Sequence, residues 1–356
     1  MRSSRPAARA LRAPTRGAET WVVFDLGSRV CRAGLGGEAA PHVLLDATRL
    51  GQLAPPADAL WDLDWQRAPH AQDARQRYAL LVRCVAQVVQ SVYQEHLLCE
   101  GHSHPVLVAH SPLGLEALRH AWCDVLLRHM HAPRVSFVDT HVLCTLAAGR
   151  TNALVVDIGY LETCVMPVYD GRPMTACLTT TPRAGKRLAQ GLAALLYAYA
   201  CQGQGPPPSR DLVEAIQTQH LVVGAPGIPG LGAAWPLDVD AFTRVYATHP
   251  TTASHVEVGG LRVPGWLRER ACELLLEPGD EDEQSIGECV ARSVRLLPRD
   301  MQRDMQASLL LAGGTAMLPG MAERLEADVA QALGAPPPTV SVLNHRTTFV
   351  PSMWRR

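Results

Sequence analysis

Short apolar runs alternate with segments of helical periodicity along most of the chain. Runs such as 21–24, 106–109 and 153–156 have the length and composition of buried strands. The segments between them place apolar residues three or four positions apart, as amphipathic helices do. Helices are expected over 77–97, 115–130, 142–148, 186–199, 211–222, 267–276 and 285–297. This alternation predicts an α/β fold with a mostly parallel inner sheet.

Three of the predicted strands run into glycine-containing turns. Apolar residues lead into Asp25-Leu-Gly27 and, about one domain later, into Asp157-Ile-Gly159; a third strand leads into Gly313-Gly-Thr315. Glycine lacks the Cβ that would keep a ligand away from the backbone, and the N–H groups of such turns favour an anion. Two similar halves that direct these turns at a shared cleft would hold a triphosphate between them.

The candidate binding residues are those of the three turns and their flanks. They are Asp25, Gly27, Ser28, Arg32, Asp157, Gly159, Gly313, Gly314 and Thr315. A carboxylate does not face phosphate directly, so Asp25 and Asp157 are expected to hold a hydrated Mg²⁺ through water. A purely structural interpretation stays open, in which the turns are tight connections and no nucleotide binds. The Thr315 hydroxyl would then cap the turn that follows it.

Breaks in the pattern predict the domain organisation. We expect a first domain over 21–152 and a second over 153–335, with a loop-rich insertion near 201–260 where glycine and proline cluster. Residues 336–356 read as a proline-rich tail. Residues 1–20 carry five arginines and one acid, which is typical of a disordered basic arm, although an organelle transit peptide has the same composition.

Composition narrows the class of protein further. The net charge of the 356 residues is −1, which gives no general attraction to nucleic acid or acidic membranes. No apolar window long enough to span a bilayer lacks charges. The ten cysteines include no C-x-x-C pair and most lie in apolar runs, as reduced thiols of a cytosolic protein do. The pairs His102/His104 and His129/His131 lack neighbouring ligands and are expected to be surface residues.

Several motifs together resemble the actin family, within the superfamily of actin, Hsp70 and the sugar kinases. They are Phe24-Asp-Leu-Gly-Ser28, Cys31-Arg-Ala-Gly34, Ala148-Gly-Arg-Thr151, Val156-Asp-Ile-Gly159, Pro167-Val-Tyr-Asp-Gly171 and Gly313–Gly320. The resemblance implies a two-domain, ribonuclease H-like duplicated fold with a nucleotide cleft. ATP or ADP with Mg²⁺ would be a structural ligand, or would be absent. Arg32 would replace a lysine that contacts the phosphates.

The sequence is most similar to the branch of the family found at the pointed end of the dynactin complex. Three features carry this similarity: Asp157-Ile-Gly-Tyr160-x-Glu162 followed by the proline-rich hairpin Pro167-x-Tyr169-x-Gly171-x-Pro173, Trp235-Pro-Leu-Asp238, and Asp282-Glu-Gln-Ser285. It implies a cytoplasmic, cytoskeletal subunit that caps a filament of actin-related protein and holds neighbouring pointed-end subunits for dynein-driven transport. Nucleic acid and direct membrane insertion are not implied. Two alternatives stay open: a subunit of a nuclear chromatin-remodelling complex, and an ATPase or kinase of the same superfamily.

Departures from the family pattern predict that the chain is not an enzyme. Tyr160 and Leu161 replace an acid and a glycine of the second phosphate turn, and the resemblance places Thr140 and Cys164 where the family orients water. Neither side chain is suited to that task. The outer lobes are expected to be reduced. The resemblance implies C-terminal helices for which the sequence shows no counterpart. We interpret this as truncation or splicing, which would bare apolar surface on the first domain; the alternative is that the first domain closes differently.

Overall fold

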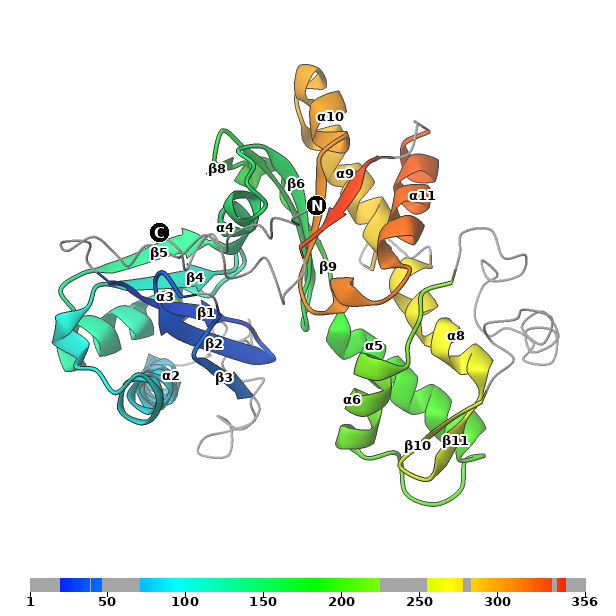
Figure 1. Ribbon diagram of the computed structural model, residues 1–356, viewed down its shortest axis with the longest axis horizontal. Coiled ribbons are helices and arrows are strands. Elements are labelled where there is room, and N and C mark those ends of the chain that lie inside the picture. Colours follow the sequence, from blue (N-terminus) through cyan, green and yellow to red (C-terminus); the bar gives the residue numbers. More distant parts are fainter. Residues whose placement is uncertain are drawn as a thin grey trace, which may run out of the picture.

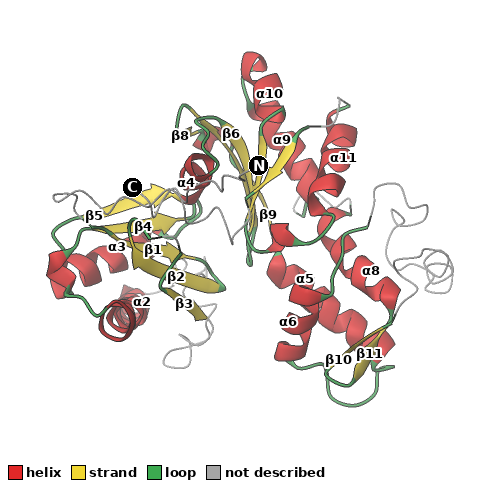
Figure 2. Cartoon of the chain, viewed as in Figure 1, coloured by secondary structure: helices red, strands yellow, loops and turns green. Residues whose placement is uncertain are grey.

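The computed structural model describes residues 20–38, 40–46, 71–224, 255–277, 283–334 and 338–343. Two α/β domains follow one another along the chain, and each is built on its own sheet (Figure 1). Figure 2 shows helices packed beside the sheets of both domains. The resemblance motif Trp235-Pro-Leu-Asp238, residues 1–19 of the arm and residues 225–254 of the insertion near 201–260 lie outside the described residues.

The first domain contains a five-stranded sheet in the order β3-β2-β1-β4-β5. Its strands are β1 (Val22–Leu26), β2 (Val30–Leu35), β3 (Val43–Asp46), β4 (Val106–His110) and β5 (Val135–Asp139). The β3-β2-β1 part is antiparallel, whereas β1, β4 and β5 are parallel. The carboxyl ends of β1 and β4 therefore point the same way, toward the second domain.

Two helices cover one face of this sheet. They are α2 (Ala71–Ser91), which continues as a π-helix to Leu97, and α3 (Glu116–Cys123), which continues as a π-helix to His129. Phe24 of β1 is fully buried between them, with its ring centroid 5.1 Å from that of Trp122 and 6.3 Å from that of Tyr93. Aromatic burial of this kind fixes β1, and hence the turn that follows it, against the helices.

The second domain repeats the strand order of the first. Its strands are β6 (Ala153–Ile158), β7 (Thr163–Tyr169), β8 (Arg172–Pro173), β9 (Thr179–Thr181), β12 (Leu309–Ala312) and β13 (Val340–Val342). Taken from β9, the order is β9-β7-β6-β12-β13, with antiparallel pairs followed by parallel ones, as in β3-β2-β1-β4-β5. This repetition confirms the predicted duplicated, actin-like two-domain fold.

Alternate residues of β6 and β12 enter two different cores, as the period of a strand requires. Leu154, Val156 and Leu311 face the large core beneath the helices α5 and α8–α11, whereas Val155 and Leu310 face the small core beneath α4. The helices are α4 (Thr140–Ala147), α5 (Gly185–Leu195, continuing as a π-helix to Ala200), α8 (Gly265–Leu276), α9 (Ile286–Leu296), α10 (Arg299–Gln306) and α11 (Met321–Leu333).

Helix α4 connects the two domains. It begins directly after β5 and ends shortly before β6, and it packs against strands of both sheets. In the second domain, α6 (Arg210–Gln219) lies beside α5, next to the hairpin β10 (Val256–Val258) and β11 (Leu261–Val263) (Figure 1). None of the described helices is long and apolar enough to cross a membrane.

The structure differs from the sequence-based elements at four places. Strand β3 lies within a proline- and alanine-rich stretch expected to be loops, and β13 lies within the expected tail, because each is an edge strand supported by its neighbour rather than by its own pattern. The segment 174–177, expected to return as the partner of β7, is mainly a 3-10 turn; β8 and β9 pair with β7 instead. Helix α10 was not anticipated.

Candidate functional site

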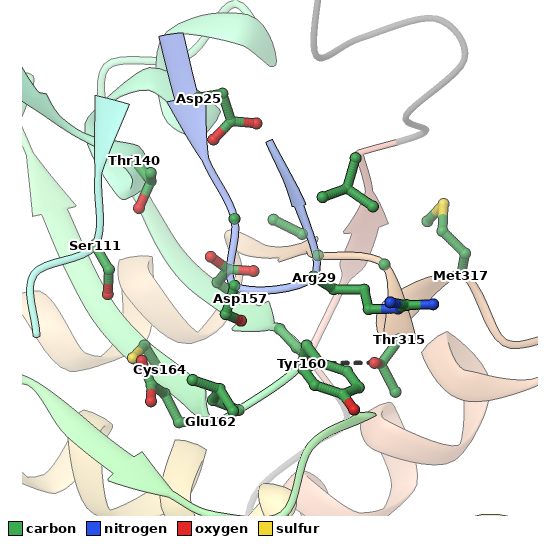
Figure 3. A pocket seen from close by; sticks show the side chains of 18 of the residues that line it. Asp25, Arg29, Ser111, Thr140, Asp157, Tyr160, Glu162, Cys164, Thr315 and Met317 are labelled. Atoms are coloured by element: carbon green, nitrogen blue, oxygen red, sulfur yellow. Dashed lines mark hydrogen bonds between the residues drawn. The ribbon is translucent and has the colours of Figure 1, made fainter. Parts of the chain in front are cut away.

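A cavity of about 400 Å³ lies between the two domains. Its volume is within the range of small-molecule sites. The nine residues singled out from the sequence (Asp25, Gly27, Ser28, Arg32, Asp157, Gly159, Gly313, Gly314 and Thr315) all line it. Figure 3 shows several of the lining side chains pointing into the same space from strands of both sheets. The fold therefore brings the three turns together as the pattern predicted.

The hairpin β1–β2 forms the first wall. The register places Asp25 opposite Arg32, and Arg32 Nη1 donates a hydrogen bond to Asp25 Oδ2 at 3.0 Å. Asp25 is buried, so the adjacent guanidinium compensates part of the cost of burying its charge. A Cβ on Gly27 would lie 2.5 Å from the carbonyl oxygen of Val30. Glycine at this position is therefore required by the tight turn itself.

The turn after β6 forms the second wall, and its backbone is bound within the protein. The N–H of Gly159 donates to the carbonyl of Glu162 at 3.2 Å, and the carbonyl of Gly159 accepts from the N–H of Gly185 at 3.1 Å. The carbonyl of Tyr160 accepts from the N–H of Lys186 at 2.6 Å. Because the Gly159 N–H is already used, this turn offers a ligand one donor fewer than an open phosphate loop would.

Thr315 ties the third turn to the second. Its hydroxyl donates to the carbonyl of Gly159 at 2.9 Å, the bond drawn as a dashed line in Figure 3. This bond joins β12's turn to the turn of β6, so the hydroxyl does not cap the turn that follows it. The oxygen retains acceptor capacity toward the cavity.

The two glycines of the third turn differ in what they permit. Gly313 has φ +94°, and a Cβ there would lie 2.3 Å from the carbonyl oxygen of Ile158 and 2.6 Å from Asp157 Oδ1. No other residue fits without displacing the β6 strand. A Cβ on Gly314 would meet no heavy atom within 4 Å. Gly314 is thus the point where a ligand can approach backbone.

Acidic side chains outnumber basic ones around the cavity. Its charged lining residues are Asp25, Asp157, Glu162, Glu214, Arg29 and Arg32. Both arginines contact carboxylates: Arg32 that of Asp25, and Arg29 those of Asp46 and Glu214. Burial, with a contribution from the charge of Asp157, raises the pKa of Glu162. An anionic ligand therefore needs an accompanying cation in this cavity.

The acids are not clustered as a direct metal site. Among the residues that the structure describes, no three histidine, cysteine or acidic side chains are placed to share a metal ion. A hydrated Mg²⁺ held by a bound phosphate, with Asp25 and Asp157 accepting from its water, is compatible with this arrangement because it needs no protein ligand set. The residues fit a nucleotide in size and in open backbone at Gly314, provided that it brings its own cation.

Sequence reasoning missed His141, which lies one residue beyond Thr140 and is fully buried. Its Nδ1 lies 3.4 Å from Asp139 Oδ1, and its Nε2 lies 3.3 Å from the Cys164 carbonyl oxygen. Burial lowers its pKa, but the hydrogen bond to Asp139 and the charges of Asp157 and Asp139 outweigh this, so that its pKa is raised. The signal was Asp139, which ends β5 and is the N-cap of α4.

The residues that replace the family pattern also lie at the cavity. Tyr160 and Leu161 line it, and so do Thr140 and Cys164. The ring of Tyr160 packs against Gly185, where a Cβ would come within 3.2 Å of it. Burial raises the pKa of the Cys164 thiol, which keeps it protonated. The side chains of Tyr160 and Leu161 thus occupy the part of the second turn where a glycine would let a ligand approach the backbone.

A comparison with protein-family models agrees with this architecture. The model of the actin family matches residues 17–204 and 265–354. The matched parts include the strands of both sheets and all three turns that line the cavity. The segment left out, 205–264, contains α6 and the β10–β11 hairpin.

Proposed function

The chain belongs to the actin family, and from this we propose that it is a non-catalytic assembly subunit. We place it at the pointed end of the dynactin complex, where it would end a short filament of actin-related protein. In that position it would dock neighbouring pointed-end subunits for dynein-driven transport in the cytoplasm.

One observation supports a structural rather than a catalytic use of the cavity. The polar groups best placed to hold a phosphate are bound to the protein's own atoms: the Gly159 N–H to a carbonyl, and Arg32 to the Asp25 carboxylate. Catalysis of phosphoryl transfer depends on donors preorganised toward the transferred group. Here those donors stabilise the cleft instead.

The proposed place in dynactin is supported by sequence motifs and not by the shape of the cavity. Asp157-Ile-Gly-Tyr160-x-Glu162 and the proline-rich hairpin after it are the features shared with that branch. Tyr160 and Glu162 are described: both line the cavity, and the Tyr160 carbonyl fixes the start of α5 through Lys186. They therefore shape the cleft without supplying a free phosphate donor.

A bound nucleotide would be a resident structural ligand in this proposal. Gly314 would admit it to the backbone, Ser28 and Arg32 would lie toward its phosphates, and Asp25 and Asp157 would accept from water on its Mg²⁺. The ligand would supply contacts to both domains at once, which favours the closed arrangement by mass action. No turnover is required for this role.

The test is purification of the protein from cells, with identification of its partners and extraction of any bound nucleotide. Dynactin subunits in stoichiometric amounts support the proposal, whereas subunits of a chromatin-remodelling complex would overturn the assignment. ATP turnover above background that is lost in Asp25→Ala would overturn the non-catalytic part. Arg128→Ala is a matched control, because Arg128 forms only an exposed pair with Asp124 on the first domain.

A further inference from the structure

One arginine makes an ionic contact between the two domains at the cavity. Arg29 lies in the turn between β1 and β2, and its Nη2 contacts the carboxylate of Glu214 on α6 of the second domain. Its Nη1 donates to Asp46 Oδ1 at 2.8 Å within the first domain. Arg29 and Glu214 both line the cavity. Figure 3 shows the Arg29 side chain extending toward the side where Thr315 and Met317 lie.

We propose that Arg29 and Glu214 form an interdomain latch that holds the cavity closed and limits exchange of its contents. The inference deepens the proposed function, since it names how the same cavity would be regulated. It differs from that function in being testable on the protein without any ligand. Neither the turn motif nor the helix α6 predicted it, because the two residues are 185 positions apart.

The first domain holds the guanidinium in position for this contact. Asp46 ends β3, which pairs with β2 in the register that places Val30 opposite Asp46. A planar guanidinium presents two separate N–H edges, so it can bond Asp46 with one and Glu214 with the other. Arg29 is therefore oriented by its own sheet before it meets the second domain.

The second domain connects Glu214 to the interior of the cavity. One helical turn further along α6, Gln217 Nε2 donates to the carbonyl of Gly185 at 3.2 Å. The N–H of Gly185 donates to the carbonyl of Gly159, which also accepts from Thr315. A displacement of Glu214 is thus linked, by hydrogen bonds, to the turn that forms the second wall.

The contact has the strength expected of a reversible closure. Arg29 is 20% exposed and Glu214 is 45% exposed, so solvent screens their attraction. Partly exposed pairs of this kind change an equilibrium by about fivefold or less. A latch of that strength retains the closed state without preventing opening, and it weakens as ionic strength rises.

Hydrogen–deuterium exchange of the full chain tests the latch directly. Glu214→Ala should raise amide exchange about fivefold in the β1–β2 turn of the other domain, and Arg29→Ala should do the same in α6. The double variant Arg29→Ala with Glu214→Ala should raise exchange no further than either single variant, because both substitutions remove the same contact. Arg187→Ala breaks the exposed pair with Glu283 inside the second domain and should leave both segments unchanged.

Two results would overturn the latch. One is an effect of each single variant confined to its own domain; the other is a double alanine variant whose effect is the sum of the two single effects. The rate of release of a fluorescent ATP analogue gives the second readout, expected to rise about fivefold in Arg29→Ala and Glu214→Ala. If the purified wild-type protein neither carries an extractable nucleotide nor binds the analogue, the structural-nucleotide part of the proposed function fails, while the exchange result still decides the latch.

Discussion

At the scale of single residues, the cavity is governed by positions that tolerate no side chain and by charges that are partly buried. Gly313 is a position that tolerates no side chain, and Glu162 carries a partly buried carboxyl group. Sequence patterns reveal the glycines, because a strand followed by Gly-Gly needs an explanation. Sequence patterns do not reveal which atoms lie against the glycine. The Ile158 carbonyl that excludes a Cβ at Gly313 belongs to a strand about 150 residues earlier in the chain.

Gly313→Ala should destabilise the chain markedly, because it adds a clash with the Ile158 carbonyl to the strain of a positive φ. We expect a loss of about 2–4 kcal/mol in the free energy of unfolding measured with urea. Gly149→Ala is the matched control: its φ is +70°, but a Cβ there meets nothing within 4 Å. It should cost only about 1 kcal/mol. Equal losses in the two variants would contradict the proposed clash.

Arg32→Ala should leave the buried carboxylate of Asp25 without its guanidinium contact. The expected loss is about 1–3 kcal/mol in thermal or chemical unfolding. Arg128→Ala removes an arginine that is 78% exposed and should be close to neutral. A neutral result for Arg32→Ala would mean that the pair does not stabilise the first wall of the cavity.

Glu162→Gln should stabilise the chain at neutral pH. Burial and the charge of Asp157 raise the pKa of Glu162 above 4.5 in the folded chain. A raised pKa contributes stability that is fully present below the unfolded value and is lost as pH rises through the folded one. The gain from the neutral glutamine should therefore vanish below about pH 4.5. Glu323→Gln makes the same exchange on the exposed face of α11 and is the matched control.

At the scale of elements, helix caps could be recognised from the sequence, whereas edge strands could not. The capping box of α9 can be recognised from the sequence pattern Ser285-x-x-Glu288. In the structure, Ser285 Oγ accepts from the Glu288 N–H, and the Glu288 carboxylate accepts from the Ser285 N–H at 2.8 Å. The strands β3 and β13 cannot be recognised in this way, because short edge strands show little alternation of apolar and polar residues. Their partners in the sheet define them.

Ser285→Ala should destabilise the second domain by about 1–2 kcal/mol, because the buried hydroxyl serves an otherwise unpaired N–H of α9. Ser209→Ala removes the equivalent bond at the exposed start of α6 and should cost about 0.5 kcal/mol. Differential scanning calorimetry of the two variants compares them directly. The reverse order of losses would contradict the role assigned to the buried cap.

At the scale of the whole molecule, the duplicated topology was predictable and the contacts across it were not. Two Asp-x-Gly turns one domain apart implied two similar halves facing one cleft, and the repeated strand order bears this out. The pairing of Arg29 with Glu214 and the contact of the buried His141 with the Cys164 carbonyl arise only when the halves meet. Hydrophobic periodicity indicates which face of a helix or strand is buried in the core of its own domain, and it carries no information on contacts between the domains.

The course of the chain through α4 has a mechanical consequence. Over the described residues the backbone passes from the first sheet to the second once, by way of this helix. This helix resists extension but offers little resistance to torsion about its own axis. Side-chain contacts across the cleft, such as that of Arg29 with Glu214, contribute to fixing the angle between the domains, and a neighbouring protein that touches both domains would do the same. Such a neighbour could lock that angle without entering the cavity.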